Sequence, residues 1–293
     1  MPSPNPSQTA QPVEIRFDCQ LAHGGPVCEV KNFRNIKELY FRMAEAIGVD
    51  VNKILFVTVN TEKCDMTKLL GGQIMFGDFL YCHVSAPTTT VINVQKVSQM
   101  FGLTITDNGN GQAFVKGKRA GSVVEHNDDI LPGDAILSIN DEVMIGKRHI
   151  DVARKLRDVP IGSMVQFVLQ PPVRGFNMVG GRSKAKVSGD INKGGMTVRI
   201  KANGDAEVVE GDKPCKRSAI EIIDQMLEDY VGIRDRELSL SIYESGTKSS
   251  DSGSFLDTVT SAYPMFAFTD QFILDVWNII SDAESGVMPK KPT

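Results

Sequence analysis

The chain has few of the features that mark several large classes of protein. Its 293 residues include one tryptophan and five cysteines, and its formal net charge is only −4. A protein of this charge has no general electrostatic attraction for nucleic acid or for anionic membranes. No apolar run approaches the roughly 20 residues that a membrane-spanning helix needs. These absences favour a cytoplasmic protein with no integral membrane segment and no nucleic acid partner.

The cysteines are too few and too scattered to predict a disulfide framework or a zinc motif. No C-x-x-C occurs, and the first residues, MPSPNPSQTAQP, lack the basic start and apolar run of a signal peptide. We therefore expect a reducing compartment and free thiols. Cys19, His23 and Cys28 share one segment, but they flank a predicted turn and fit ordinary strand positions better than a zinc site. We expect no metal and no cofactor.

Sequence signatures of enzymes are also missing. Gly109-Asn110-Gly111 begins like a dinucleotide-binding fingerprint, but Phe114 stands where the third glycine is needed. The NGNG stretch fits a hairpin turn better, because Asn and Gly accept positive φ angles. Neither a phosphate-binding G-x-x-x-x-G-K-[ST] nor a G-x-S-x-G nucleophile motif occurs. We therefore do not expect catalysis.

Segments rich in turn-forming residues divide the sequence into units, and this organisation predicts a multidomain α+β protein. Residues 12–86 read as strand, strand, helix, strand, short helix, strand, the order of a ubiquitin-like β-grasp domain. Its helix is expected over residues 36–47, with Asn35 as the N-cap and Gly48 at the end. Residues 90–172 read as a second unit, of several strands and one helix.

Three further segments complete the expected organisation. Residues 1–11 read as a disordered tail. Residues 173–213 read as a linker that contains one β-hairpin, turning at Asn203-Gly204. Residues 214–286 carry apolar residues at helical spacing and predict a small C-terminal helical domain.

The middle unit carries the most specific motifs. Gly102 stands between two bulky apolar residues in Met100-Phe101-Gly102-Leu103, at the head of an alternating strand. Glycine weakens strands, so it is expected where the backbone turns or another chain comes close. The stretch LPGDAILSIN at 131–140 matches the G-D-x-I-L-x-V-N-G signature of PDZ domains nearly in full, except that Asp141 replaces the last glycine. Residues 90–172 therefore resemble a PDZ domain, which has a β-barrel-like fold.

The resemblance implies a groove that binds the C-terminus of a peptide. An edge strand accepts the peptide as an additional strand, and the loop around Gly102 offers backbone N–H donors to the terminal carboxylate. His149, Ala153 and Leu156 share one helix face beside this strand. A neutral His149 is expected to bond a Ser or Thr hydroxyl in tails of the type Ser/Thr-x-apolar-COOH. The expected peptide-binding residues are Met100, Phe101, Gly102, Leu103, Thr104, Ile105, His149, Ala153 and Leu156.

A purely structural role is an alternative interpretation for several of these residues. Ile105 and Leu156 can be plain core residues, and a histidine at a helix N-terminus is usually a polar residue near solvent. The PDZ-like motifs around them favour the functional interpretation.

The order of units resembles the GIPC (synectin) family of adaptor proteins. The matching stretches include KLLGGQI at 68–74, GKRHIDVARKL at 146–156 and DYVGIRDRELS at 229–239. The resemblance implies a non-enzymatic scaffold whose PDZ domain binds C-terminal tails of transmembrane receptors and of a G-protein regulator. It also implies a homodimer formed by the first domain and recruitment of myosin VI by the last. The protein would then be peripheral on endocytic vesicles, and its terminal domains would cover the groove until cargo arrives.

Binding of a helical motor segment needs an apolar groove on the last domain. The candidates are Met226, Tyr230, Ile233 and Leu238, together with Trp277, which fits a core position better. Two alternative functions stay open. One is a structural dimer whose PDZ groove is closed by its own chain, and the other is a regulatory PDZ protein of a hydrolase.

Overall fold

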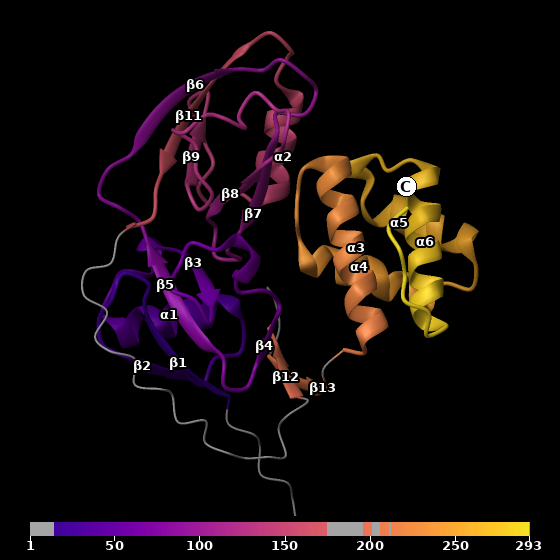
Figure 1. Ribbon diagram of the computed structural model, residues 1–293, viewed down its shortest axis with the longest axis horizontal. Coiled ribbons are helices and arrows are strands. Elements are labelled where there is room, and N and C mark those ends of the chain that lie inside the picture. The colour runs from indigo at the N-terminus through magenta and orange to yellow at the C-terminus, as the bar shows by residue number, and fades with distance from the viewer. Residues whose placement is uncertain (1–14, 175–195, 201–205, 211, 293) are drawn as a thin grey trace, which may run out of the picture.

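The computed structural model describes residues 15–174, 196–200, 206–210 and 212–292. The expected disordered tail, most of the expected linker and the Asn203-Gly204 turn lie outside these residues. Figure 1 shows two β-rich units, indigo to magenta, and a helical unit, orange to yellow, that lies beside them.

The first unit is a four-stranded sheet with one packed helix. The strand order is β2-β1-β5-β3, and β1 and β5 run parallel while the other pairs are antiparallel. Helix α1 begins after Asn35, whose side chain accepts a hydrogen bond from the Glu38 N–H, and it ends at Gly48 with φ 79°. This helix is where the sequence predicts it. Its elements are β1 (Arg16–Leu21), β2 (Cys28–Lys31), α1 (Ile36–Ile47), β3 (Ile54–Val59) and β5 (Phe79–Val84).

The second unit is a β-sheet with one helix packed on its edge strand. The strand order is β6-β11-β9-β8-β7, so β7 is an edge strand, and α2 packs on it. Asp141 adopts φ 65°, a left-handed conformation that Asp tolerates better than most residues, which explains how it replaces glycine in this turn. The elements are β6 (Thr90–Gln95), β7 (Leu103–Asp107), β8 (Ala113–Lys118), β9 (Ala135–Ile139), β10 (Glu142–Val143), α2 (His149–Asp158) and β11 (Met164–Gln170).

The third unit is a bundle of four helices around its own core. Phe255 and Leu227 are fully buried there, and Trp277 is partly buried against the same cluster. The Asp235, Asp251 and Thr269 side chains cap three of the helices. The helices are α3 (Pro214–Val231), α4 (Arg236–Lys248), α5 (Ser252–Ala262) and α6 (Asp270–Glu284). No helix in the described parts of the chain is long and apolar enough to span a membrane.

A hairpin joins the first and third units. Strands β12 (Met196–Arg199) and β13 (Glu207–Glu210) pair with each other, and β12 also pairs with β4 (Gln73–Met75). Val198 is fully buried in the core of the first unit. The sequence assigned this hairpin to a linker, because nothing local signals its pairing with a strand more than 120 residues earlier.

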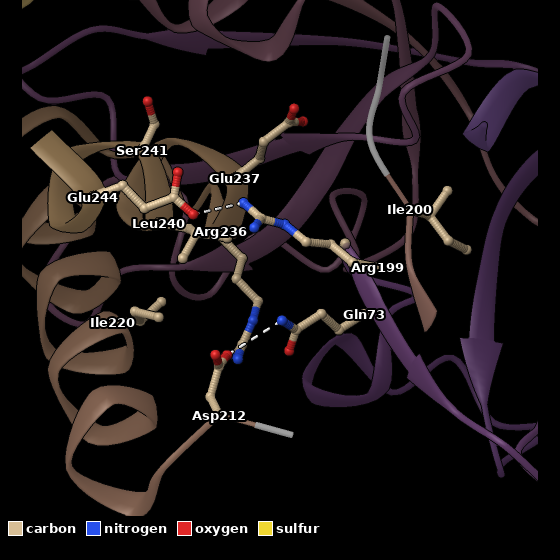
Figure 2. Close-up of a pocket in the computed structure, with 11 residues that line it drawn as sticks. Gln73, Arg199, Ile200, Asp212, Ile220, Arg236, Glu237, Leu240, Ser241 and Glu244 are labelled. Carbon is tan, nitrogen blue, oxygen red and sulfur yellow. Dashed lines mark hydrogen bonds and ion pairs between the residues drawn. The ribbon is translucent and has the colours of Figure 1, made fainter. Parts of the chain in front are cut away.

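An ion pair and a hydrogen bond connect the sheet of β4, β12 and β13 to the helical unit and to the residues just before it. Arg199 lies 2.9 Å from a carboxylate oxygen of Glu244, and Gln73 donates a hydrogen bond of 3.2 Å to Asp212 (Figure 2). Arg199 and Arg236 extend into a cavity of about 170 Å³ between these elements. Two arginines and three carboxylates line this cavity, so it is a charged seam between the units.

Candidate functional site

Gly102 is the turn that the sequence motif requires. Its φ is +93°, and a Cβ at this position would collide with Cβ and Oγ of Ser122. The Arg119 N–H donates a hydrogen bond of 2.8 Å to the Gly102 carbonyl. Phe101 packs edge-on against Phe167, with ring centroids 5.2 Å apart, and this contact anchors the loop in the core. Only glycine fits here without displacing the neighbouring turn.

The expected groove residues converge between β7 and α2. Met100, Phe101, Leu103, Ile105, Ala153 and Leu156 line one common pocket. The space left in it is about 20 Å³, which is room for about one water molecule and not for an apolar side chain. Val231, from the end of α3, lines the same pocket. The structure brings these predicted residues together around one pocket, and the chain itself leaves almost no free volume in it.

Residues 231–235, here called the covering segment, lie along β7. The Ile105 N–H donates a hydrogen bond of 3.2 Å to the Gly232 carbonyl, and Ile105 and Ile233 form a parallel bridge. A Cβ on Gly232 would lie 3.1 Å from Cε of Met100, and its φ of +76° also favours glycine. The covering segment thus uses the edge of β7 that an added peptide strand would need.

Side chains of the helical unit reinforce this contact. Thr104 Oγ1 donates a hydrogen bond of 2.8 Å to Glu228 Oε1, next to the covering segment. Arg119 reaches the Asp229 carbonyl at 3.4 Å. The helical unit is therefore bonded both to β7 and to the turn that supports Gly102.

A buried charge cluster lies at the start of α2. One carboxylate oxygen of Asp107 accepts hydrogen bonds from the His149 N–H at 3.0 Å and from Nδ1 of its ring at 2.6 Å. The same oxygen lies 2.9 Å from Nε of Arg148. On the other side of the ring, Nε2 lies 3.3 Å from Oδ2 of Asp235, in the covering segment. His149 is only 2% exposed.

This cluster makes His149 a cation. Burial by itself lowers its pKa, but hydrogen bonding to Asp107 and the nearby Asp235 carboxylate outweigh burial and raise the pKa to about 9. Burial raises the pKa of Asp107, but its bonds to His149 hold that pKa below its usual range. The sequence-based expectation of a neutral imidazole is thus corrected. The positive charge of His149 is caused by two carboxylates that are far from it in the sequence.

The Nε2–H of His149 is incompletely satisfied. The contact with Asp235 is an ion pair without hydrogen-bond alignment, and Nε2 has no hydrogen-bond partner among the described residues. Burial of a donor without a well-aligned acceptor is energetically unfavourable, so an acceptor with better alignment would stabilise this site.

The candidate motor-binding residues are not on an open surface. Met226, Ile233 and Leu238 are at most 8% exposed within the helical core, and the Tyr230 hydroxyl donates a hydrogen bond of 2.9 Å to the Ala267 carbonyl. Ile233 also contacts β7. This placement corrects the expectation that they line an accessible groove, because packing of a small bundle consumes their apolar surface.

The residues of the site that sequence analysis missed include Asp107, Gly232 and Asp235. The preference for Asp at N-cap positions is a sequence signal for Asp235, which precedes α4. In the structure its side chain accepts hydrogen bonds from the N–H groups of Glu237 and Leu238. Gly232 has the local signal of a helix C-terminus. Neither signal shows that these residues cover the groove.

Comparison with known families identifies both outer units. The family model described as the GIPC1-3 GH1 domain matches residues 16–82, and the model described as the GIPC1-3 GH2 domain matches residues 194–283.

Relatives resemble the chain over nearly its whole length. The PDZ domain-containing protein GIPC3 of Mus musculus is 39% identical over 288 residues, which covers 96% of this chain and 97% of that protein. The human protein GIPC1 is 40% identical and the human protein GIPC2 is 41% identical. These two matches cover 92% of this chain each, and 82% of GIPC1 and 85% of GIPC2.

Solved structures of a related PDZ domain are also similar. The PDZ domain from choanoflagellate GIPC is 37% identical, with a TM-score of 0.30, and covers 31% of this chain and 99% of that chain. The same domain has been solved bound to a GAIP peptide, at 36% identity, and to a B1AR peptide, at 37% identity. Their TM-scores and coverages equal those of the unbound domain.

Proposed function

Because the chain belongs to the GIPC family of PDZ domain-containing proteins, we propose that its middle unit binds the free C-termini of transmembrane receptors and of G-protein regulators. The family consists of PDZ adaptor proteins and not of enzymes. The chain is thus a scaffold whose chemistry is recognition.

The single observation that carries this proposal is the convergence of loop, edge strand and helix at one groove. Gly102 turns the backbone beside the head of β7, and Leu103 and Leu156 line the adjoining pocket. This combination suits a peptide that adds to β7 with its carboxylate at the loop and its last apolar side chain in the pocket.

We propose further that the groove is closed in the free chain and opens for cargo. The hydrogen bond between Ile105 and Gly232, and the ion pair between His149 and Asp235, support a closed state. A receptor tail that binds β7 must displace the covering segment. Because a tail binds the open state more tightly than the closed state, its binding shifts the chain toward the open state.

The remaining parts of the proposal concern the outer units. The family resemblance supports recruitment of myosin VI by the helical unit, a homodimer through the first unit and a place on endocytic vesicles. The strand order β2-β1-β5-β3 around one helix supports a ubiquitin-like β-grasp for residues 12–86. Opening of the groove would release Ile233 from β7 and change the surface offered to the motor.

The GAIP and B1AR peptides are suitable ligands for a direct test with the full chain. Each peptide is labelled and titrated as the free acid and as the C-terminal amide, with fluorescence anisotropy as the readout. The proposal expects the amide to bind at least tenfold more weakly, because it removes the charge that the backbone N–H groups of the loop bind. Equal binding of acid and amide would contradict the carboxylate assignment.

A second candidate function is a structural protein whose groove never opens. The free space of about 20 Å³ in the pocket favours it. In that case neither peptide would bind, and native mass spectrometry would give the same assembly with and without peptide.

A further inference from the structure

We propose that the subsite at the start of α2 recognises a carboxylate, so that tails with an acidic residue two positions before the last are ligands of this groove. This inference rests on the proposed function and concerns the specificity of the same site. It extends the ligand class beyond the Ser and Thr tails that a neutral histidine would select.

Strand geometry places the relevant side chain. Successive side chains of an added strand point to opposite faces, so the last residue and the residue two before it point the same way. When the last side chain enters the pocket of Leu103 and Leu156, the side chain two positions earlier also faces α2. The first residue of that helix is His149.

The ring of His149 is fixed with a donor toward the groove. Asp107 holds Nδ1 at 2.6 Å, so the nitrogen that faces the groove is Nε2. His149 is 98% buried, and its Nε2 has no hydrogen-bond acceptor in the described chain. A peptide side chain that brings a well-aligned acceptor therefore gains a charge-assisted hydrogen bond.

The chain supplies its own example of the preferred ligand. Asp235 presents a carboxylate to His149, with Oδ2 at 3.3 Å from Nε2, and the same oxygen lies 3.7 Å from Nη2 of Arg148. Two cations thus face one carboxylate oxygen. A tail that displaces Asp235 removes a negative charge from a buried site, and only an acidic side chain restores it. A neutral tail leaves His149 with Asp107 alone.

Asp107 is the positioning residue of this arrangement. It does not reach the peptide, but it orients the imidazole and keeps it positively charged. The neutral replacement Asp107→Asn should therefore change the ratio between the affinities for acidic and neutral tails. It should change the affinity for tails in general by a smaller factor. A purely structural role would weaken every tail by the same factor.

The test uses one labelled peptide with an apolar C-terminal residue, in versions with Asp, Asn, Ser or Ala two positions before the end. The protein is the full chain with Asp235→Asn, which removes the internal carboxylate and keeps an amide oxygen able to cap α4. We expect the Asp version to bind about tenfold more tightly than the isosteric Asn version. In the chain that also carries Asp107→Asn, we expect this ratio to fall to near one.

A pH profile of the same ratio provides a readout that does not depend on the Asp107 variant. The charged groups that face His149 are Asp107 on β7, Arg148 before α2 and, in the native chain, Asp235 before α4. In the native chain Asp235 contributes to the raised pKa of His149, so only the direction carries over to the Asp235→Asn chain. We expect the ratio to be highest at the acidic end of the profile and to fall as the pH rises and His149 loses its proton. A ratio that does not change with pH would contradict the inference.

The outcomes separate this inference from the function on which it rests. If the Ser version binds and the Asp version binds no more tightly than the Asn version, the carboxylate subsite is refuted and the groove stands. If no version binds with a free C-terminus, the proposed peptide groove itself is refuted. Tight binding of the Asp version that is lost in the chain with Asp107→Asn supports both.

Discussion

At the scale of single residues, Gly102 has no room for a Cβ. Gly102→Ala adds a Cβ that collides with Ser122 at a φ of +93°. The matched control is Gly121→Ala, since Gly121 also has positive φ, +74°, but has open space around its Cβ position. We expect the control to lose about 1–2 kcal/mol from backbone strain alone. Gly102→Ala should lose about 1–3 kcal/mol more from overpacking.

Chemical denaturation of the two variants measures this difference, and anisotropy measures peptide binding. We expect Gly102→Ala to abolish binding of a free-acid peptide, because displacement of the loop moves its N–H donors. Equal stability losses at the two glycines would show that the Ser122 contact carries no strain.

His149 gives the stability of the closed chain a pH dependence. Its pKa rises from 6.5 to about 9 in the folded chain, so its contribution is fully present below pH 6.5 and is lost as the pH rises through 9. Asp107 and Asp235 have lowered pKa values, so their contributions are lost only in acid. We expect protection of the Ile105 amide from hydrogen exchange to fall between pH 7 and 10, after correction for the intrinsic exchange rate.

The control for this prediction is His149→Asn. It removes the titrating group, so the corrected protection should be lower and nearly constant between pH 7 and 10. A native chain whose protection changes no more than that of the variant would show that His149 does not hold the groove closed.

At the scale of elements, α2 forms one wall of the groove and depends on Lys96. This side chain is fully buried, and its ammonium donates hydrogen bonds of 2.8, 2.7 and 2.6 Å to the carbonyls of Leu156, Arg157 and Val159. A cation at this position satisfies the last carbonyls of the helix and complements its dipole. Lys96 therefore holds the end of α2 that lines the pocket beside β7.

Lys96→Met should destabilise the chain by about 2–4 kcal/mol, because buried carbonyls lose a charged donor. The control is Lys118→Met, which removes one hydrogen bond of 2.9 Å, to the Asn127 carbonyl, and should lose about 1 kcal/mol. Thermal unfolding compares the two variants. A loss at Lys96 no larger than at Lys118 would contradict the proposed anchoring of α2.

Local signals explain which elements were predictable from sequence. The ends of α1 follow from Asn35 and Gly48, and the loop around Gly102 follows from a motif of four residues. The pairing of β12 with β4 joins segments more than 120 residues apart and has no local signal. The charge of His149 was likewise missed, because it depends on carboxylates 42 residues before it and 86 residues after it. Contacts between units decide what local patterns leave open.

At the scale of the whole molecule, contacts at two places join the helical unit to the other two units. The hairpin of β12 and β13 ties the helical unit to the first unit, and the covering segment ties it to the groove. A peptide that enters the groove must break the second connection and leaves the first intact. Under the proposed function, binding of a tail and release of the helical unit are coupled equilibria, and each biases the other by the same free energy.

The most direct test of this account is hydrogen exchange of the full chain with and without a saturating free-acid GAIP or B1AR peptide. The account predicts faster exchange across residues 228–238, the covering segment and its flanks, while β7 stays protected because the peptide replaces the Gly232 carbonyl as the partner of the Ile105 N–H. The C-terminal amide of the same peptide should leave both regions unchanged. Peptide binding that leaves residues 228–238 as protected as in the free chain would contradict the account.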